Sequence, residues 1–266
     1  MLEDLPRARR RAIPVTARCA LGIMTKAPAS GSVKTRLVPP LSYDEAAALH
    51  TTFLKDTAEN ILRATGLCAC EGVALYTPAG TGPAMEALLP KSFRLVCQRG
   101  EALGERLLSA TADLLAGGYA SVCLIDSDSP TLPLAALTTA VALLARPGER
   151  VVLGPADDGG YYLIGVKAMH RELFAGISWS TDRVFAQTVA RAEEARLDAE
   201  VLPRWYDVDD RPSLHRLCEE LFGAPAGPYG GLHGYHAPHT RRLLARLLSS
   251  ARKRVWPQPL VGGHLW

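Results

Sequence analysis

The sequence has no apolar run long enough to cross a membrane and no pair of cysteines with the usual metal-binding spacing. None of its hydrophobic stretches approaches the roughly 18 residues of a membrane-spanning helix. Its six cysteines include no CxxC pair. The closest two, Cys68 and Cys70, could bind a metal in an extended segment, but their spacing favours packing over metal binding. These absences favour a reduced, cytoplasmic protein without a membrane span.

The chain also has little excess charge. Thirty basic and 27 acidic residues leave a formal charge of +3 over 266 residues. Much of the excess lies in residues 1–18, which lack the apolar core of a secretory signal and are expected to form a flexible arginine-rich extension. No basic patch with interleaved aromatic residues follows, so nucleic acid is not an expected partner.

What the sequence does contain is an alternation of short apolar runs with helical periodicity. Buried strands are expected at 20–24, 72–77, 93–97, 122–125, 151–153, 161–166 and 200–208, with helices between them. Ser42 and Glu45 form a capping box that predicts the start of the longest helix. The pattern predicts one α/β domain over residues 19–222, with a predominantly parallel sheet covered by helices on both faces. Residues 223–266 are expected to form a loop and a helix packed on that domain.

Two carboxylates follow the central strand, in the stretch SVCLIDSDSPTLP. Asp126 and Asp128 stand one residue apart, ahead of two prolines that prevent the strand from continuing. Ligands of open α/β sheets bind beyond the carboxyl ends of the strands. Paired carboxylates there suit Mg²⁺ or Mn²⁺, which keeps its other positions for water and phosphate. The alternative is that both residues cap the next helix and bind nothing.

The loop after the first strand, TKAPASGSVKTRL, is neither a Walker loop nor a GxGxxG motif. It does combine Gly31 with Lys26, Lys34 and Arg36. Backbone N–H groups and nearby cations can hold a diphosphate or triphosphate, although a solvated basic loop would have the same composition. Its place after the first strand favours phosphate binding. The later stretch QRGEALGERL could bring Gly104, Glu105 and Arg106 toward a ligand, although the start of a helix would have the same sequence.

The segment GPADDGGYYLIG places two acids before two glycines. Paired glycines permit positive φ angles and a close approach of ligand to backbone. The segment is therefore either a hairpin turn with solvated acids or part of a substrate site formed by Asp157, Asp158, Gly159 and Gly160. Asp207, at the end of the last expected strand, belongs to the same edge of the sheet.

Two further segments carry candidate residues. In GISWSTDRV, Trp179 either stacks on a substrate or fills the core, and Ser180 is expected to cap a helix. Ser180 and Thr181 are also candidate substrate-binding residues beside Trp179. Near the C-terminus, His233, His236 and His239 have a spacing that suggests zinc. Glycines and a proline around them predict a loop instead, and no cysteine or carboxylate accompanies them, so the sequence does not favour a zinc site there.

Six of these motifs occur in a familiar order: TKAPASGSVKTRL, QRGEALGERL, LIDSDSPTLP, GPADDGGYYLIG, GISWSTDRV and WYDVDD. Together they resemble a bacterial family of GT-A-like glycosyltransferases of the arsenosugar-biosynthesis type, within the nucleotide-diphospho-sugar transferase superfamily. The resemblance runs from about residue 20 to 221, and APHTRRLLARL resembles the closing helix of that family. It implies a GT-A fold related to the Rossmann fold.

The resemblance also implies roles for individual residues. It places a divalent metal at Asp128 and a nucleotide under the loop carrying Lys34 and Arg36. The turn from Asp158 to Gly160 would line the acceptor or sugar side. The family usually has glycine where this chain has Asp126, so Asp128 is the matched carboxylate. In related nucleotidyltransferases the position of Asp207 supplies a ligand to a second metal.

The implied reaction is glycosyl transfer from a nucleoside diphosphate sugar to a small-molecule acceptor. Lys34 and the metal on Asp128 would stabilise the leaving diphosphate, and Asp158 would orient or deprotonate the acceptor. The close alternative is nucleotidyl transfer from a triphosphate to a phosphorylated acceptor, because VKTRLVPPLSYDEAAAL also resembles a guanylyltransferase group that makes a deazaflavin precursor. A third alternative is a binding module without turnover. The sequence does not identify the base, sugar, acceptor, stereochemical outcome or oligomeric state.

Overall fold

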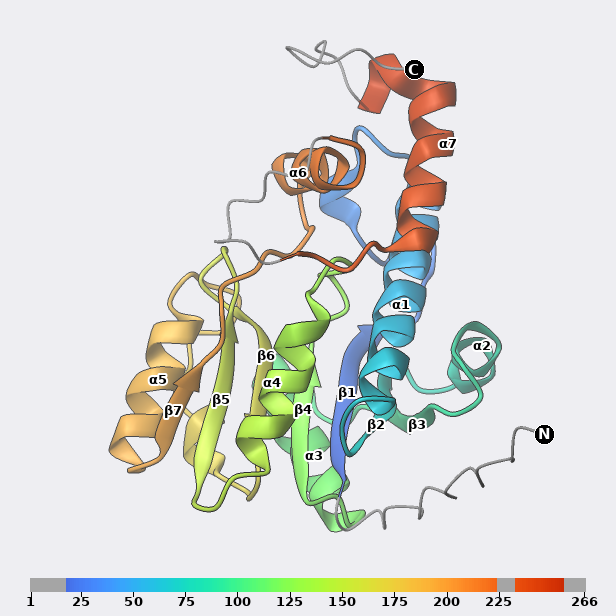
Figure 1. The fold of residues 1–266 in the computed structure, drawn as a ribbon. Coiled ribbons are helices and arrows are strands. Elements are labelled where there is room, and N and C mark those ends of the chain that lie inside the picture. The colour runs from blue at the N-terminus through green and yellow to red at the C-terminus, as the bar shows by residue number, and fades with distance from the viewer. Residues whose placement is uncertain (1–17, 224–232, 256–266) are drawn as a thin grey trace, which may run out of the picture.

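The computed structural model describes residues 18–223 and 233–255 (Figure 1). Nearly all of the predicted extension at 1–18 therefore lies outside the described residues. Within the described ranges every helix is too short or too polar to serve as a membrane span.

A seven-stranded sheet forms the centre of the molecule, in the order β3-β2-β1-β4-β6-β5-β7. Only β6 runs antiparallel to its neighbours, β4 and β5. The strands are β1 Cys19–Lys26, β2 Cys70–Thr77, β3 Arg94–Cys97, β4 Ser121–Ile125, β5 Arg150–Pro155, β6 Tyr161–Val166 and β7 Asp198–Val201. The predicted, predominantly parallel sheet is therefore confirmed. The strand expected at 200–208 ends at Val201, because Pro203 interrupts it, and a single bridge from Ala156 to Trp205 continues the pairing.

Helices cover both faces of the sheet, as predicted (Figure 1). They are α1 Tyr43–Thr65, α2 Gly82–Leu88, α3 Leu103–Ala116, α4 Leu134–Leu144, α5 Val184–Glu194, α6 Arg211–Phe222 and α7 Pro238–Val255, with 3-10 turns at Thr35–Leu37 and Arg171–Phe174. One core cluster joins α1, α4, α6 and α7 to the sheet, and a second lies beneath α3 and α5 on the opposite face. The sheet is thus buried on both sides, which explains the continuous apolar runs of its strands.

Helix α1 begins where its sequence indicates. The Ser42 hydroxyl accepts the N–H of Glu45 at 3.2 Å, and the Glu45 carboxylate accepts the N–H of Ser42 at 2.7 Å, completing the predicted capping box. Leu49 and Phe53 are fully buried against the sheet. The helix is therefore fixed at its N-terminus and along one face, and this fixes the loop that connects it to β1.

The strand order changes direction between β1 and β4. The chain runs outward from β1 through β2 to β3 and then crosses back to place β4 on the other side of β1. The loops that leave β1 and β4 therefore diverge at their carboxyl ends. Such a switch point is where open α/β sheets bind ligands, and the Lys34 loop and the Asp126–Asp128 loop both lie there.

Candidate functional site

A cleft of about 370 Å³ opens at the switch point, between the loop after β1 and the start of α3. Its lining includes the cationic side chains of Lys26, Arg36 and Arg106 together with the carboxylates of Asp128 and Asp209. The cleft thus brings the predicted phosphate loop and the predicted metal carboxylate to one place.

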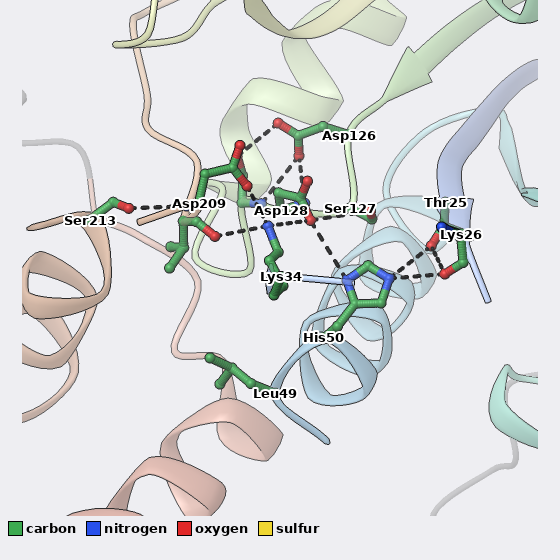
Figure 2. Close-up of polar contacts among 12 residues, drawn as sticks. Thr25, Lys26, Lys34, Leu49, His50, Asp126, Ser127, Asp128, Asp209 and Ser213 are labelled. Atoms are coloured by element: carbon green, nitrogen blue, oxygen red, sulfur yellow. Dashed lines mark hydrogen bonds and ion pairs between the residues drawn. The ribbon is translucent and has the colours of Figure 1, made fainter. Parts of the chain in front are cut away.

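Lys34 ties the two loops of the cleft together (Figure 2). Its ammonium lies 2.7 Å from Asp128 and 2.7 Å from Asp209, and it donates to the carbonyl of Val208 at 2.8 Å. The side chain is only 4% exposed. Burial alone would lower the pKa of Lys34, but the two carboxylates outweigh it and raise that pKa. Lys34 is therefore a permanently charged cation held at the acidic end of the cleft.

The backbone supports this position of Lys34. Its φ of 49° and ψ of 36° lie in the left-handed region, which a lysine rarely adopts. The two segments that contact the Lys34 side chain are joined to each other by a hydrogen bond from the Val208 N–H to the Asp128 carbonyl, at 2.9 Å. A strained residue whose side chain carries two ion pairs is typical of a functional site.

His50, on α1, faces the same carboxylate. Its Nε2 lies 3.0 Å from the carbonyl of Lys26, and its Nδ1 lies 3.7 Å from Asp128 and has no hydrogen-bond partner among the described residues. Burial lowers the pKa of His50, although the Asp128 charge opposes that shift. When the His50 ring is neutral and donates from Nε2 to the Lys26 carbonyl, the lone pair of Nδ1 faces the carboxylate of Asp128. That arrangement calls for a cation or a donor between them.

Asp126 holds the loop in shape. It accepts the N–H groups of Asp128 and Ser129 at 3.1 and 3.2 Å and the Ser129 hydroxyl at 3.0 Å. Burial raises its pKa well above the ordinary range, and Asp128 and Asp207 add to that shift. Both of its oxygens already accept hydrogen bonds within the loop. Its role as a metal ligand stays a prediction. The helix-capping alternative is wrong, because Asp126 closes its own turn and the N-cap of α4 is Pro133.

Asp207, another predicted metal ligand, lies near Asp128 at the carboxyl edge of the sheet. Burial and then the charges of Asp158 and Asp209 raise its pKa to about 6. Asp158, Asp207, Asp209 and Asp128 therefore interact across one surface, and the excess of negative charge favours a bound cation. Asp126, Asp128 and Asp207 do not, however, form a set of ligand atoms within 4.8 Å of one another among the described residues.

The glycine turn after β5 is built against the segment before α5. The Gly159 carbonyl accepts the N–H of Phe185 at 2.9 Å, and the φ of Gly159 is 88°. A Cβ at this position would lie 2.2 Å from the carbonyl oxygen of Asp182. Asp158 is exposed and accepts the N–H of Gly160 at 2.7 Å. Of the four residues predicted here, Asp158 is free to face a substrate.

Asp157 instead forms an ion pair with Arg216 of α6 at 2.6 Å. The guanidinium of Arg216 also stacks over Tyr206 at 4.0 Å. Asp157 thus ties the turn to α6, a structural role beside its predicted substrate role.

Trp179 covers the start of α3. A Cβ on Gly104 would lie 2.4 Å from the indole nitrogen, so only glycine fits beneath the ring. Gly104 is buried, and the cleft is lined at this point by Leu103 and Arg106. The predicted phosphate role of Gly104 stays a prediction, and the half-exposed Arg106 is the cation that this helical turn places in the cleft.

Ser180 and Thr181 follow Trp179 on the surface, next to the glycine turn. Ser180 is not a helix N-cap, contrary to expectation: its φ is 62°, and α5 begins after Arg183. The Thr181 hydroxyl accepts the N–H of Arg183 at 3.3 Å. Both residues are exposed, so their predicted substrate role stays open. Gly31 is exposed too, with a φ of 73°, in the loop that lines the cleft.

The cleft also contains His50 and Asp209, to which the sequence assigned no role, whereas Arg106 lies in a stretch expected near the ligand. For His50, the available signal was a histidine on the apolar face of the helix predicted after Ser42. Asp209 stands two residues after Asp207, a spacing that puts both on one side of an extended segment. Arg106 lies within the QRGEALGERL motif.

Comparisons with known proteins agree with this fold. A family described as uncharacterized protein conserved in bacteria, DUF2064, matches residues 61–181. Among curated proteins, none matches the chain in sequence. A crystal structure of a presumed nucleotide-diphospho-sugar transferase from Desulfovibrio desulfuricans G20 is 29% identical and has a TM-score of 0.74; the match covers 90% of this chain and 98% of that one. A cytidylyltransferase from Leptospira borgpetersenii serovar Hardjo-bovis shares the fold at 12% identity, with a TM-score of 0.51 and coverage of 92% and 100%.

Proposed function

We propose that this chain, a GT-A-like member of the nucleotide-diphospho-sugar transferase superfamily, is a metal-dependent glycosyltransferase that uses a nucleotide-activated sugar. One observation carries the proposal: a single cleft combines three exposed or half-exposed cations with the carboxylates of Asp128 and Asp209. A nucleoside diphosphate bound with a divalent ion needs both, because its phosphate oxygens bind cations and its metal binds carboxylates.

The acidic end of the cleft fits Mg²⁺ or Mn²⁺. Asp128 would hold the ion together with Asp209 or Asp207, and the unpartnered Nδ1 of His50 faces Asp128. An imidazole donor favours Mn²⁺ over Mg²⁺, which prefers oxygen ligands. Bound there, the ion would neutralise charge that develops on the departing diphosphate.

The chain's own residues supply the remaining steps. Lys34 stays protonated and can redirect a hydrogen bond from Asp209 to a phosphate oxygen. Arg36 and Arg106 hold the diphosphate by charge-assisted bonds. As the acceptor oxygen bonds to the anomeric carbon and the bond to the diphosphate breaks, Asp158 takes the acceptor proton. Trp179, Ser180 and Thr181 lie beside this turn and form the acceptor side.

Nucleotidyl transfer is the second candidate, and the number of cations favours it. Lys26, Lys34, Arg36 and Arg106 all line the cleft, which is enough positive charge for a triphosphate. In that reaction a phosphorylated acceptor attacks the α-phosphorus and pyrophosphate leaves.

The two reactions differ in their donors and products. We would first measure thermal stability with Mn²⁺ or Mg²⁺ and a panel of nucleoside triphosphates, nucleoside diphosphates and nucleotide sugars, because a ligand of the native state raises its melting temperature. The best donor is then incubated with candidate acceptors. Release of a nucleoside diphosphate supports glycosyl transfer, and release of pyrophosphate supports nucleotidyl transfer.

An Asp128→Asn variant tests the site itself. It should lose metal-dependent stabilisation by nucleotide and all turnover. The matched control is Asp198→Asn, which changes an exposed aspartate at the start of β7, at the opposite end of the strands. Equal activity of the two variants would contradict the proposal.

A further inference from the structure

A second group of potential metal ligands lies where α7 packs along α1 (Figure 1). Asp56 and Glu59 stand one turn apart on α1, and His239 lies in the first turn of α7. One ligand atom from each lies within 4.8 Å of the other two. The Nε2 of His239 is 3.4 Å from Glu59. No carboxylate lies near His239 in the sequence. The fold brings Asp56 and Glu59 next to it from a helix about 180 residues earlier.

The contacts of Asp56 orient it as a ligand. Its two oxygens accept the N–H groups of His239 and Thr240, at 3.0 and 2.7 Å. The Thr240 hydroxyl also contacts this carboxylate. The three contacts fix the carboxylate, and since its two oxygens have four lone pairs, one pair is left for an ion. Hydrogen bonds of this kind hold the ligands of metal sites in position. Asp56 is fully buried, while Glu59 and His239 are about one-third exposed and leave a path for an ion.

Tyr235 supplies an independent observation. The residue is only 6% exposed, and its hydroxyl has no hydrogen-bond partner among the described residues. The phenol lies close enough to Glu59 and Asp56 to interact with both carboxylates. The hydroxyl interacts with Glu59 but makes no well-formed hydrogen bond, which buried hydroxyls normally have.

A purely structural explanation accounts for part of this arrangement. Asp56 caps α7, and the Glu59–His239 contact has the geometry of a weak surface ion pair. Neither explains why the Tyr235 hydroxyl lacks a well-formed hydrogen bond. A metal ion with a bound water would give that hydroxyl a partner and would offset the negative charge of the buried Asp56.

We propose that Asp56, Glu59 and His239 bind a divalent transition-metal ion of the zinc class, which joins α7 to α1. Two carboxylates and an imidazole match the oxygen and nitrogen ligands of Zn²⁺. An imidazole in the set disfavours Mg²⁺. This site is separate from the cation proposed at Asp128: His50, at the cleft, precedes Asp56 by six residues, or about 9 Å along the helix.

The test uses the full chain, first treated with a chelator and then titrated with Zn²⁺ by calorimetry and by thermal denaturation. We expect one ion to bind at this site and to raise the melting temperature, with no such effect from Mg²⁺ at equal concentration. Asp56 is left intact because its removal would also uncap α7. The variants are instead Glu59→Gln and His239→Gln, at partly exposed positions, which should each weaken Zn²⁺ binding about tenfold or more.

Two controls make the result specific. His170→Gln alters another histidine between two glutamates, but Glu149 and Glu172 contact opposite ring nitrogens and cannot share one ion with it. That variant should bind Zn²⁺ like the unmodified chain. Asp128→Asn should also keep this site even though it loses the proposed activity. Absence of Zn²⁺ stabilisation, or equal Zn²⁺ affinity in His239→Gln and His170→Gln, would overturn the assignment.

Discussion

The ammonium of Lys34 lies 2.7 Å from the carboxylate of Asp128, and both belong to loops that leave neighbouring strands at the switch point of the sheet. The contact lowers the pKa of Asp128, although burial alone would raise it. It also places a fixed positive charge beside the carboxylate that we assign to the metal. The lysine and the ion therefore have to share this end of the cleft, and a bound phosphate would give Lys34 a second partner.

Replacing Lys34 should affect both the stability of the fold and the rate of the proposed reaction. Lys34→Gln leaves the carboxylates of Asp128 and Asp209 without their cation, so we expect a loss of about 2 kcal/mol in unfolding free energy. Turnover should fall by roughly 100-fold or more, because a charge that stabilises the leaving group is gone. Urea unfolding and steady-state kinetics check both. The control is Lys26→Gln, an exposed lysine of the same cleft, whose stability should stay within about 0.5 kcal/mol of the original.

Arg106 should contribute to binding of the nucleotide. Its guanidinium lines the cleft and donates to the Gly100 carbonyl at 3.0 Å. Arg106→Gln removes one charge-assisted contact, so we expect the KM of the donor to rise about tenfold with little change in melting temperature. The control is Arg99→Gln, which pairs with Asp113 outside the cleft. If both variants keep the original KM, the cleft does not bind the diphosphate as proposed.

The Gly159 turn offers a comparison between two glycines with positive φ. Gly31→Ala meets no atom within 4 Å and should cost only the left-handed backbone penalty, about 1–2 kcal/mol. Gly159→Ala adds a Cβ 2.2 Å from the Asp182 carbonyl and should cost about 3 kcal/mol or more. Denaturant unfolding measures the difference. Similar losses in the two variants would show that the turn moves freely away from α5.

Glu220 should make stability depend on pH. Burial raises the pKa of this carboxyl, although hydrogen bonds from Tyr206 and Thr131 oppose the shift. The folded chain then holds this proton more tightly than the unfolded chain does. The unfolding free energy therefore falls as the pH rises from about 4.5 through the raised pKa, and it stays lower above that.

In Glu220→Gln this part of the pH dependence should disappear, so the variant gains stability relative to the original chain between pH 4.5 and pH 7. Urea unfolding at several pH values gives the comparison. Glu219→Gln, at the exposed neighbour, removes the same charge and should keep the original slope. If the unfolding free energy of Glu220→Gln changed with pH as it does in the original chain, the pKa of Glu220 would not be raised by folding.

The strands, the long helix and the superfamily could be predicted because each depends on local signals. Apolar runs mark strands buried on both faces, and the Ser42–Glu45 box determines where α1 starts. The GT-A-like superfamily is confirmed, whereas the arsenosugar-type family within it stays a prediction. Asp128, Lys34 and Arg36 line one cleft because all three follow strands that meet at the switch point, and their roles stay predictions.

The remaining features depend on contacts between segments that are distant in sequence. Gly104 was assigned to a phosphate because the sequence does not show that Trp179 covers it. Ser180 has the composition of a helix cap, but packing of its segment on the Gly159 turn gives it a left-handed backbone. His239 was expected in a loop, whereas the Asp56 carboxylate caps a helix that begins at Pro238. Side-chain partners across the fold decided each case.

The Asp56 cap on α7 also affects the timing of folding during synthesis. Helix α1 contributes Leu49 and Phe53 to the core, and the same core includes Leu244 and Leu247 of α7. About 170 residues separate the two helices, so at 5–20 residues per second a ribosome needs roughly 10–35 s to supply the second after the first. During that interval the outer side of α1 has neither its apolar cover nor a partner for Asp56. The nascent chain therefore exposes this side of α1 to chaperones until its last described helix has emerged.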